Sequence, residues 1–315
     1  MNPRTAAAAF ALLTCCYIGI FALLETRRHL QGLGQFLGAL PVLLSLTAVG
    51  WVARFLRWQW LLRRAGCRVP AGPALLAYLS GFAFTATPGK VGELVRMRYF
   101  ASYGVPHWKV LAAFVYERAC DLVVVLLLAT LAFHDPRLFA LATAFVGGIV
   151  AIVLLFALRP AVLTHAQVRS RRAGHRRLAR LARFLRNGLA GCRLWLRPAD
   201  LGISVTLALV AWGTTSLALV YLARSMGLAL PVLSGLGIYP LAMLVGAASM
   251  LPGGVGTTEA VIVAMLAARG VPWQAAAVVA LGARLATLWF AMAAGLLSVG
   301  CLEYARARRA RAAPA

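Results

Sequence analysis

The chain has 315 residues, of which 62% are hydrophobic, and its mean hydropathy is +0.83. This much apolar surface excludes a water-soluble globular domain and predicts an integral membrane protein. The formal net charge is +24, and the basic residues crowd near 54–68, 159–197 and 306–311. Such crowding is typical of the cytoplasmic loops of multi-span membrane proteins.

Apolar runs of spanning length predict six full transmembrane helices. In chain order they lie near 6–24, 38–60, 108–133, 138–158, 200–223 and 273–300. The first run resembles a signal peptide but has no convincing small-x-small cleavage site, so we expect it to be retained as a span.

Two further apolar stretches run directly into Pro-Gly motifs. Residues 73–87 lead into "TPGKVGE" and residues 228–250 lead into "LPGGVGTTE", and a short helical piece follows each motif. Backbone released from a helix inside a bilayer costs several kcal/mol per unsatisfied group unless protein or water satisfies it. We therefore expect two re-entrant hairpins beside a cavity, in an all-α polytopic fold of eight apolar segments.

The Pro-Gly motifs belong to a longer internal repeat, about 73–133 and about 228–300. In both copies Pro-Gly-x-Val-Gly and a glutamate precede Gly-Val-Pro, and twelve residues after that proline comes Arg118 or Arg284. The arginines near 54–68 and the eleven between Arg159 and Arg197 indicate cytoplasmic segments. Three crossings then separate the copies and invert the second, while both termini, including the basic tail 303–315, are expected in the cytoplasm.

Charged residues at predicted membrane depth form the first part of the candidate substrate site. Glu117 and Asp121 share one helical face with Arg118 close by, and Arg284 brings a second arginine from the last span. The four charges sum to zero, so they could simply neutralise one another between helices. Alternatively, the arginines meet an anionic head group while the acids hold them in place.

The first hairpin supplies the second part of the site. Amides that follow Pro88 and Gly89 begin a helix whose positive dipole end suits a phosphate. Gly89 and Gly92 would let a ligand approach the backbone, and Lys90 would add a mobile positive charge. Glu93 would cap those amides, receive a proton or pair with a substrate amine. The simpler alternative is that Glu93 only caps the helix and Lys90 extends to the membrane surface.

The second hairpin is not chemically equivalent to the first, because Gly254 stands where the first copy has Lys90. Its candidate residues are Pro252, Gly253, Gly254, Gly256, Thr257, Thr258 and Glu259.

The arginine-rich segment 159–198 predicts a partner at the membrane surface. Its leucines and Phe184 recur at helical spacing, which favours an amphipathic helix on anionic lipid over nucleic acid binding. No nucleotide-binding loop, hydrolase elbow or zinc motif is present, and the cysteines have no metal-ligand spacing. We therefore expect no cofactor, no metal and no nucleic acid partner.

The motifs "TPGKVGE", "ERACDL" and "LPGGVGTTE" resemble the lysylphosphatidylglycerol synthase transmembrane-region family, also described as flippase-like proteins. The resemblance covers nearly the whole chain and implies one polytopic domain, 1–315, that moves lipids between the leaflets of a bacterial inner membrane. Because the chain ends at Ala315, we expect no synthase domain and no aminoacyltransferase activity. The substrate then stays open among a phospholipid, a polyprenyl-phosphate-linked sugar and a hopanoid.

A non-enzymatic lipid flippase is thus the leading hypothesis, and two alternatives stay open. One is an integral-membrane transferase that uses Glu93, Glu117 or Asp121 as a base on a lipid-linked substrate. The other is a membrane scaffold for enzymes of lipid or glycan biosynthesis, with the basic segment as its docking surface.

Overall fold

The computed structural model describes residues 31–132 and 176–312, together with Gly19 and scattered positions between 137 and 169. Within these residues every regular element is helical. The predicted crossings 6–24 and 138–158 lie outside the continuously described residues.

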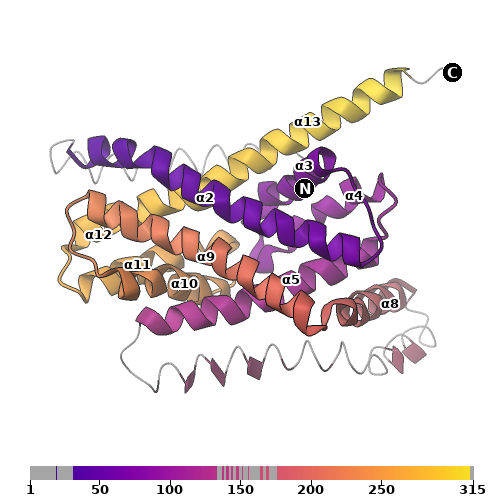
Figure 1. The fold of residues 1–315 in the computed structure, drawn as a ribbon, viewed down its shortest axis with the longest axis horizontal. Helices are drawn as coiled ribbons and strands as arrows, with labels where there is room; N and C mark the ends of the chain where they lie inside the picture. The colour runs from indigo at the N-terminus through magenta and orange to yellow at the C-terminus, as the bar shows by residue number, and fades with distance from the viewer. Residues whose placement is uncertain are drawn as a thin grey trace.

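Three long apolar helices correspond to predicted crossings. They are α2 (Gln31–Arg64), α9 (Pro198–Ser225) and a continuous helix made of α12 (Trp273–Arg284), a π-helical turn (Leu285–Trp289) and α13 (Phe290–Ala312). Each contains a segment that is long and apolar enough to cross a membrane. Figure 1 shows α2 and α9 side by side and running in opposite directions, and their contact is the most extensive between any two described helices.

The residues of the predicted crossing 108–133 form the helix α5 (His107–Ala129), extended by the 3-10 turn Thr130–Ala132. It differs from the three long helices because charged side chains interrupt its apolar sequence at Glu117, Arg118 and Asp121. Helices α2, α9, α8 (Arg176–Gly191) and α10 (Val232–Ala248) all pack against α5. A charged helix is tolerated inside a membrane bundle when neighbouring helices supply its partners.

Both Pro-Gly motifs break their helices as predicted. The first hairpin comprises α3 (Ala71–Leu79), two 3-10 segments (Ser80–Phe84 and Pro88–Val95) and α4 (Arg96–Ala101). The second comprises α10 (Val232–Ala248), the 3-10 turn Pro252–Gly254 and α11 (Thr257–Ala267).

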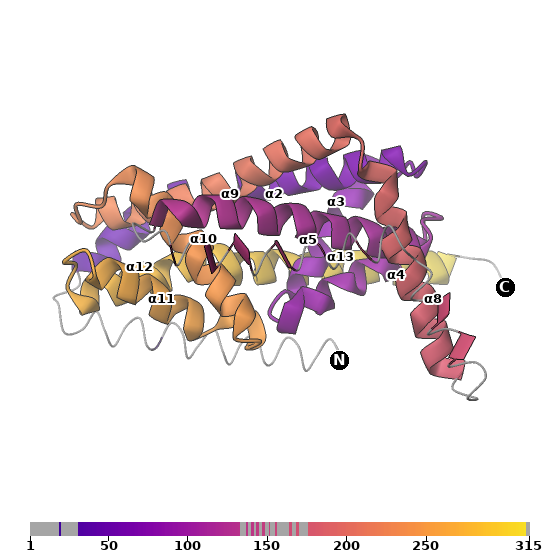
Figure 2. The same cartoon turned by 90° about the horizontal axis from the view of Figure 1, so that it is seen from below.

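The hairpins enter the bundle from opposite ends and meet in its interior (Figures 1 and 2). A Cβ built on Gly253 would lie 3.4 Å from the Cα of Ala86, so the two breaks touch. Because each arm is shorter than a membrane span, neither hairpin needs to cross the bilayer.

The two Gly-Val-Pro turns have the same backbone geometry. Gly104 and Gly270 have φ of +74° and +81°. The amide of Val105 donates to Phe100 O and that of Val271 donates to Leu266 O, both at 3.2 Å. Equal hydrogen bonds at positions 166 residues apart show that the sequence match extends to the backbone.

A second pair of matching turns lies upstream of the predicted repeat. Gly66 and Gly227, both with φ of +75°, lie two residues after the ends of α2 and α9, and a proline four residues later is the N-cap of α3 or α10. The glycine amides donate to Arg63 O and Arg224 O at 3.0 and 2.9 Å. Matching turns therefore occur upstream of the predicted repeat as well, after the ends of α2 and α9.

The described part of the basic segment forms α8 (Arg176–Gly191) and the 3-10 turn Cys192–Trp195. Helix α8 packs closely on α5 because its glycines leave room. A Cβ on Gly188 would overlap Leu111, and one on Gly191 would lie 2.8 Å from the Cβ of Ala112. The predicted helix is present, and one of its faces is attached to the bundle.

Candidate functional site

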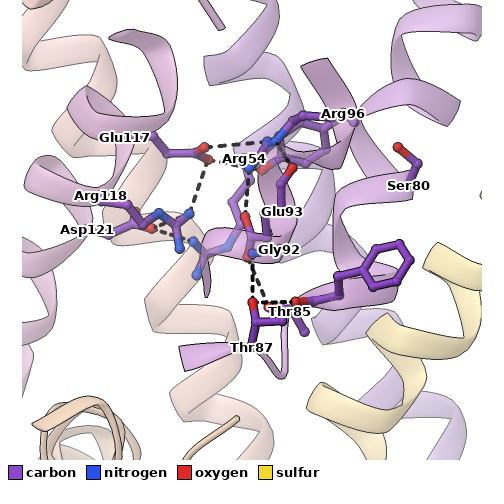
Figure 3. A network of polar contacts seen from close by, with 12 residues as sticks. Arg54, Ser80, Thr85, Thr87, Gly92, Glu93, Arg96, Glu117, Arg118 and Asp121 are labelled. Atoms are coloured by element: carbon purple, nitrogen blue, oxygen red, sulfur yellow. Dashed lines mark hydrogen bonds and ion pairs between the residues drawn. The ribbon is translucent and has the colours of Figure 1, made fainter. Parts of the chain in front are cut away.

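Charged side chains gather in the interior where α2, the first hairpin and α5 meet (Figure 3). We call them the interior charge cluster, which consists of Arg54, Arg57, Glu93, Arg96, Glu117, Arg118 and Asp121. Three elements distant in sequence thus form one polar site within an apolar bundle.

Buried ion pairs join α2 to α5. Arg57 Nη2 lies 3.0 Å from Glu117 Oε1 and 2.8 Å from Asp121 Oδ1. Arg54 Nη1 lies 2.8 Å from Asp121 Oδ2. Because Arg57 and Glu117 are completely buried, removing either one would take a close partner from a charge in a low-dielectric interior.

The first hairpin joins the cluster through Glu93 and Arg96. Arg96 Nη2 lies 2.7 Å from Glu93 Oε2, and the Thr85 hydroxyl donates to Glu93 Oε1 at 2.9 Å. Arg96 also lies 3.8 Å from Glu117 Oε2, and its guanidinium stacks 4.3 Å from the centre of the Trp58 ring. The hairpin tip is therefore held to both α5 and α2 by charge.

Two of the arginines and Lys90 form the less buried edge of the cluster. Arg118 Nη2 lies 3.1 Å from Asp121 Oδ2, but its side chain is 22% exposed and its buried Nε makes no hydrogen bond to the described residues. Lys90 Nζ and Arg54 Cζ lie 5.9 and 4.8 Å from the centre of the Trp212 ring. Lys90 makes no ion pair within the described chain, where Arg118 and Arg54 repel its charge and Glu93 and Asp121 attract it from a greater distance than an ion pair.

The site carries more positive than negative charge. The cluster contains four arginines and three carboxylates, and Lys90 adds one further positive charge. Unbalanced charge away from water is unfavourable, and an anion that reaches the Lys90–Arg118 edge would neutralise it. Among the described residues, no group of His, Cys, Asp or Glu is placed to hold a metal ion.

The second hairpin has a smaller and balanced set of charges. Arg284 Nε lies 2.9 Å from Glu259 Oε1, and Glu259 Oε2 accepts the Gly256 amide at 2.7 Å. Arg284 also donates to the carbonyl of Gly253. The last span is thus tied directly to the Pro-Gly break of the second hairpin.

This pairing corrects the predicted grouping of Glu117, Asp121, Arg118 and Arg284. Arg284 pairs with Glu259, whereas the α5 acids pair with Arg54, Arg57 and Arg118. The four charges therefore do not neutralise one another as a set. The reason is that α12 packs on α11, which carries Glu259, whereas the charged residues of α5 face Arg57 of α2 and Arg96 of the first hairpin. Sequence spacing alone does not reveal this arrangement.

The predicted roles of the glycines and of Glu93 also change. A Cβ on Gly92 would lie 2.5 Å from Phe84 O, so this glycine serves hairpin packing and leaves no room for a ligand there. Glu93 pairs with Arg96 and does not cap the helix; the Gly92 amide bonds to Thr87 Oγ1 instead. The predicted contacts of Pro88 and Gly89 with a ligand stay predictions, because the structure does not describe the environment of these two residues.

The remaining candidates of the second hairpin stabilise its break. Gly254, like its counterpart Lys90, has positive φ (+63° and +55°). Thr257 Oγ1 donates to Gly254 O, and Thr258 is completely buried against Gly246 and Gly254. These residues face their own hairpin, so they contribute shape rather than contacts to the interior charge cluster.

Sequence reasoning missed three arginines of the cluster. Their sequence position assigns Arg54 and Arg57 to the cytoplasmic loop charges, yet both pair with acids of α5. The basic residues that mark the end of α2 are therefore only Arg63, Arg64 and Arg68. Arg96 had a detectable signal, because it follows Glu93 by three residues on a helical segment.

Comparison with known proteins gives one family. The family described as lysylphosphatidylglycerol synthase TM region matches residues 5–295, which is most of the chain. A search of curated proteins finds no match. The family match and the apolar helices agree on a multi-pass membrane protein of lipid metabolism or transport.

Proposed function

The chain belongs to the lysylphosphatidylglycerol synthase TM region family, and from that premise we propose that it is a lipid translocase of the bacterial inner membrane. It moves a lipid with an anionic or phosphate-linked head group between leaflets. The observation that carries this proposal is the excess positive charge at the Lys90–Arg118 edge of a buried, otherwise paired cluster.

The positive charge favours phosphate-bearing substrates. Arginine and lysine bind phosphate oxygens by charge-assisted hydrogen bonds. A phospholipid or a polyprenyl-phosphate-linked sugar carries such a group, whereas a hopanoid without phosphate would leave the excess charge unbalanced. Glu93, Glu117 and Asp121 hold the arginines and limit their net charge, so that the head group can leave after it binds.

The proposed architecture has six crossings and two re-entrant hairpins in an inverted repeat, with both termini in the cytoplasm. Support comes from the matching turns at Gly66 and Gly227 and at Gly104 and Gly270, and from the opposite directions of α2 and α9 (Figure 1). Such repeats build transporters whose halves move against each other around a central site.

The two hairpins then act as gates on opposite sides of that site. In this structure the Glu259–Arg284 pair closes the second hairpin onto the last span. The first hairpin keeps Lys90 half-buried and without an acid partner in the described chain. The head group enters beside Lys90, passes Arg118 and leaves past the second hairpin when the Glu259–Arg284 region rearranges.

The test is leaflet exchange in proteoliposomes that contain fluorescent phosphatidylglycerol. A membrane-impermeant quencher reports how quickly the protected inner-leaflet lipid becomes accessible. We expect exchange above that of protein-free vesicles, with Arg118→Gln much slower and Arg98→Gln, an exposed control, unchanged. Exchange equal to that of empty vesicles for every anionic lipid tried would refute translocation. Turnover of a lipid donor without exchange would favour the transferase alternative.

A further inference from the structure

A groove of about 720 Å³ lies outside the interior charge cluster, where α8 crosses the end of α2 and the start of α5. Its lining includes Arg64, Trp108, Asn187, Arg193, Leu194 and Arg197. Its volume falls within the range of ligand-binding clefts. We propose that this groove binds the phosphate head group of an anionic phospholipid that stays bound and is not transported.

The groove is held in shape by close packing beneath it. Gly188 and Gly191 bring α8 against Leu111, Ala112 and Trp108, where any Cβ would be too close. On the other side, Asp200 is almost completely buried and accepts hydrogen bonds from Trp60 Nε1 at 2.9 Å and Arg64 Nε at 3.0 Å. The wall that carries Arg64 is therefore ordered before a ligand arrives.

The charge of the groove suits a phosphate. None of its lining residues is acidic. The nearby Asp200 is not part of the lining and is already paired with Arg64. Arg193 and Arg197 are exposed and belong to the turn that joins α8 to α9. One guanidinium group can donate two parallel hydrogen bonds to phosphate oxygens. Several arginines in one cleft can therefore hold a phosphodiester from more than one side.

The apolar part of the lining favours a lipid over a free phosphate ion. Leu194 is 43% exposed at the groove, and Trp108 lies beside the arginines. Tryptophan beside basic residues is typical of the membrane–water interface, where one side of a site is apolar and the other is wet.

This inference does not rest on the proposed transport activity. The groove residues come from α8, the turn after it and the ends of α2 and α5. None of them belongs to the interior charge cluster. A lipid held there would anchor α8 against the bundle, whether or not the cluster moves a head group.

The test compares two double variants that lose equal charge. Arg193→Gln with Arg197→Gln removes two groove arginines, and Arg63→Gln with Arg68→Gln removes two exposed arginines at the end of α2 outside the groove. Each protein is placed in nanodiscs of phosphatidylcholine and phosphatidylglycerol, and retained lipids are counted by native mass spectrometry. We expect the ratio of retained phosphatidylglycerol to phosphatidylcholine to fall about tenfold in the groove variant and to change by less than about twofold in the control.

Three outcomes decide the proposal. Equal losses in the two variants would show general attraction to surface charge and overturn the site. Displacement of phosphatidylglycerol from the wild type by inorganic phosphate at equal concentration would overturn the lipid assignment. If the groove variant loses its retained phosphatidylglycerol but keeps normal leaflet exchange, this would support a lipid that stays bound and is not transported. Thermal unfolding of the groove variant is measured alongside, and because both arginines are exposed we expect it unchanged.

Discussion

Lys90 is held in a backbone conformation that disfavours its side chain. Its φ is +55°, and its counterpart Gly254 has φ of +63°. A non-glycine residue in this region costs on the order of 1 kcal/mol. The second hairpin avoids that cost with glycine, so the lysine in the first is consistent with a need for its charge beside Arg54 and Arg118.

Replacing Lys90 with glycine separates charge from backbone strain. Lys90→Gly should weaken binding of phosphatidylglycerol several-fold and slow leaflet exchange, because the excess positive charge falls. Since glycine accepts positive φ, the free energy of unfolding should stay equal or rise by about 1 kcal/mol. Lipid affinity and thermal unfolding of the purified protein measure the two effects. Unchanged lipid affinity would remove Lys90 from the site.

Arg57 and Arg118 should differ although both lie near Glu117 and Asp121. Arg57 is completely buried, so Arg57→Met should destabilise the protein by about 3–5 kcal/mol, because Glu117 loses its closest arginine in a low-dielectric interior. Adding Glu117→Gln should restore part of this loss, because the less well paired carboxylate is then gone. Arg118→Gln should destabilise the protein less than Arg57→Met but slow leaflet exchange more, since the Arg118 side chain reaches the exposed edge of the cluster. Equal stability losses in Arg57→Met and Arg118→Gln would contradict this division.

The broken helices depend on close backbone approach, which only glycine permits. Gly92 lies against Phe84 and Thr87 of its own hairpin with no room for a Cβ, whereas Gly253, beside Ala86 of the other hairpin, needs glycine because its φ is +64°. Polar hairpin atoms are satisfied locally, for example by Thr87 and Glu259. The hairpins can therefore lie at membrane depth without leaving these amides unpaired.

Gly92→Ala should destabilise the first hairpin by about 1–3 kcal/mol, because its Cβ would overlap the Phe84 carbonyl. The control is Gly72→Ala in the same hairpin, where no atom lies within 4 Å and alanine is the better helix former. Thermal unfolding in detergent should show a loss for the first variant and none for the second. A stable Gly92→Ala protein would mean that the hairpin is looser than the structure shows.

At the scale of the whole molecule, the two halves match in backbone but not in charge. Both have a long helix, a broken hairpin and a helix that bears an arginine, joined by equivalent glycine turns. The first half also holds Arg57, Glu117 and Asp121, whereas Ala218, Ala283 and Thr287 stand at the matching positions of the second. The polar site thus lies in the first of the two regions that share these turns.

Single cysteines at matching positions test whether the halves are inverted. Ser102→Cys and Ala268→Cys lie at the exposed ends of α4 and α11, before glycines whose positive φ makes them unsuitable for cysteine. An impermeant thiol reagent should label Ala268→Cys in intact cells and Ser102→Cys only after the cells are opened.

The single-cysteine variants are made in a protein in which Cys15, Cys16 and Cys301 have been replaced. Cys301 is exposed and would itself react with the reagent. Cys192 can stay, because burial raises the pKa of its thiol to about 12 and no reactive thiolate forms at neutral pH. Labelling of both positions from the same side would contradict the inverted repeat.

The sequence by itself determined the membrane class, the helical fold and the two hairpins. Apolar runs of spanning length and Pro-Gly breaks are local features, because one segment must bury its own side chains and satisfy its own backbone in lipid. The motif "TPGKVGE", the Gly-Val-Pro turns and the family could therefore be predicted from neighbouring residues. The upstream turns at Gly66 and Gly227 escaped notice because a lone glycine and proline are weak signals.

Only the tertiary structure decided which charges meet. Glu117 lies closest to Arg57 of α2, Arg284 pairs with Glu259, and Arg118 lies closer to Asp121 than to Glu117. An arginine in the second half of a helix has the same sequence appearance whether it is exposed or meets a buried acid, as Arg63 and Arg54 illustrate. The choice depends on which helices pack together, and long-range packing brings a carboxylate 67 residues away to within hydrogen-bonding distance of Arg54.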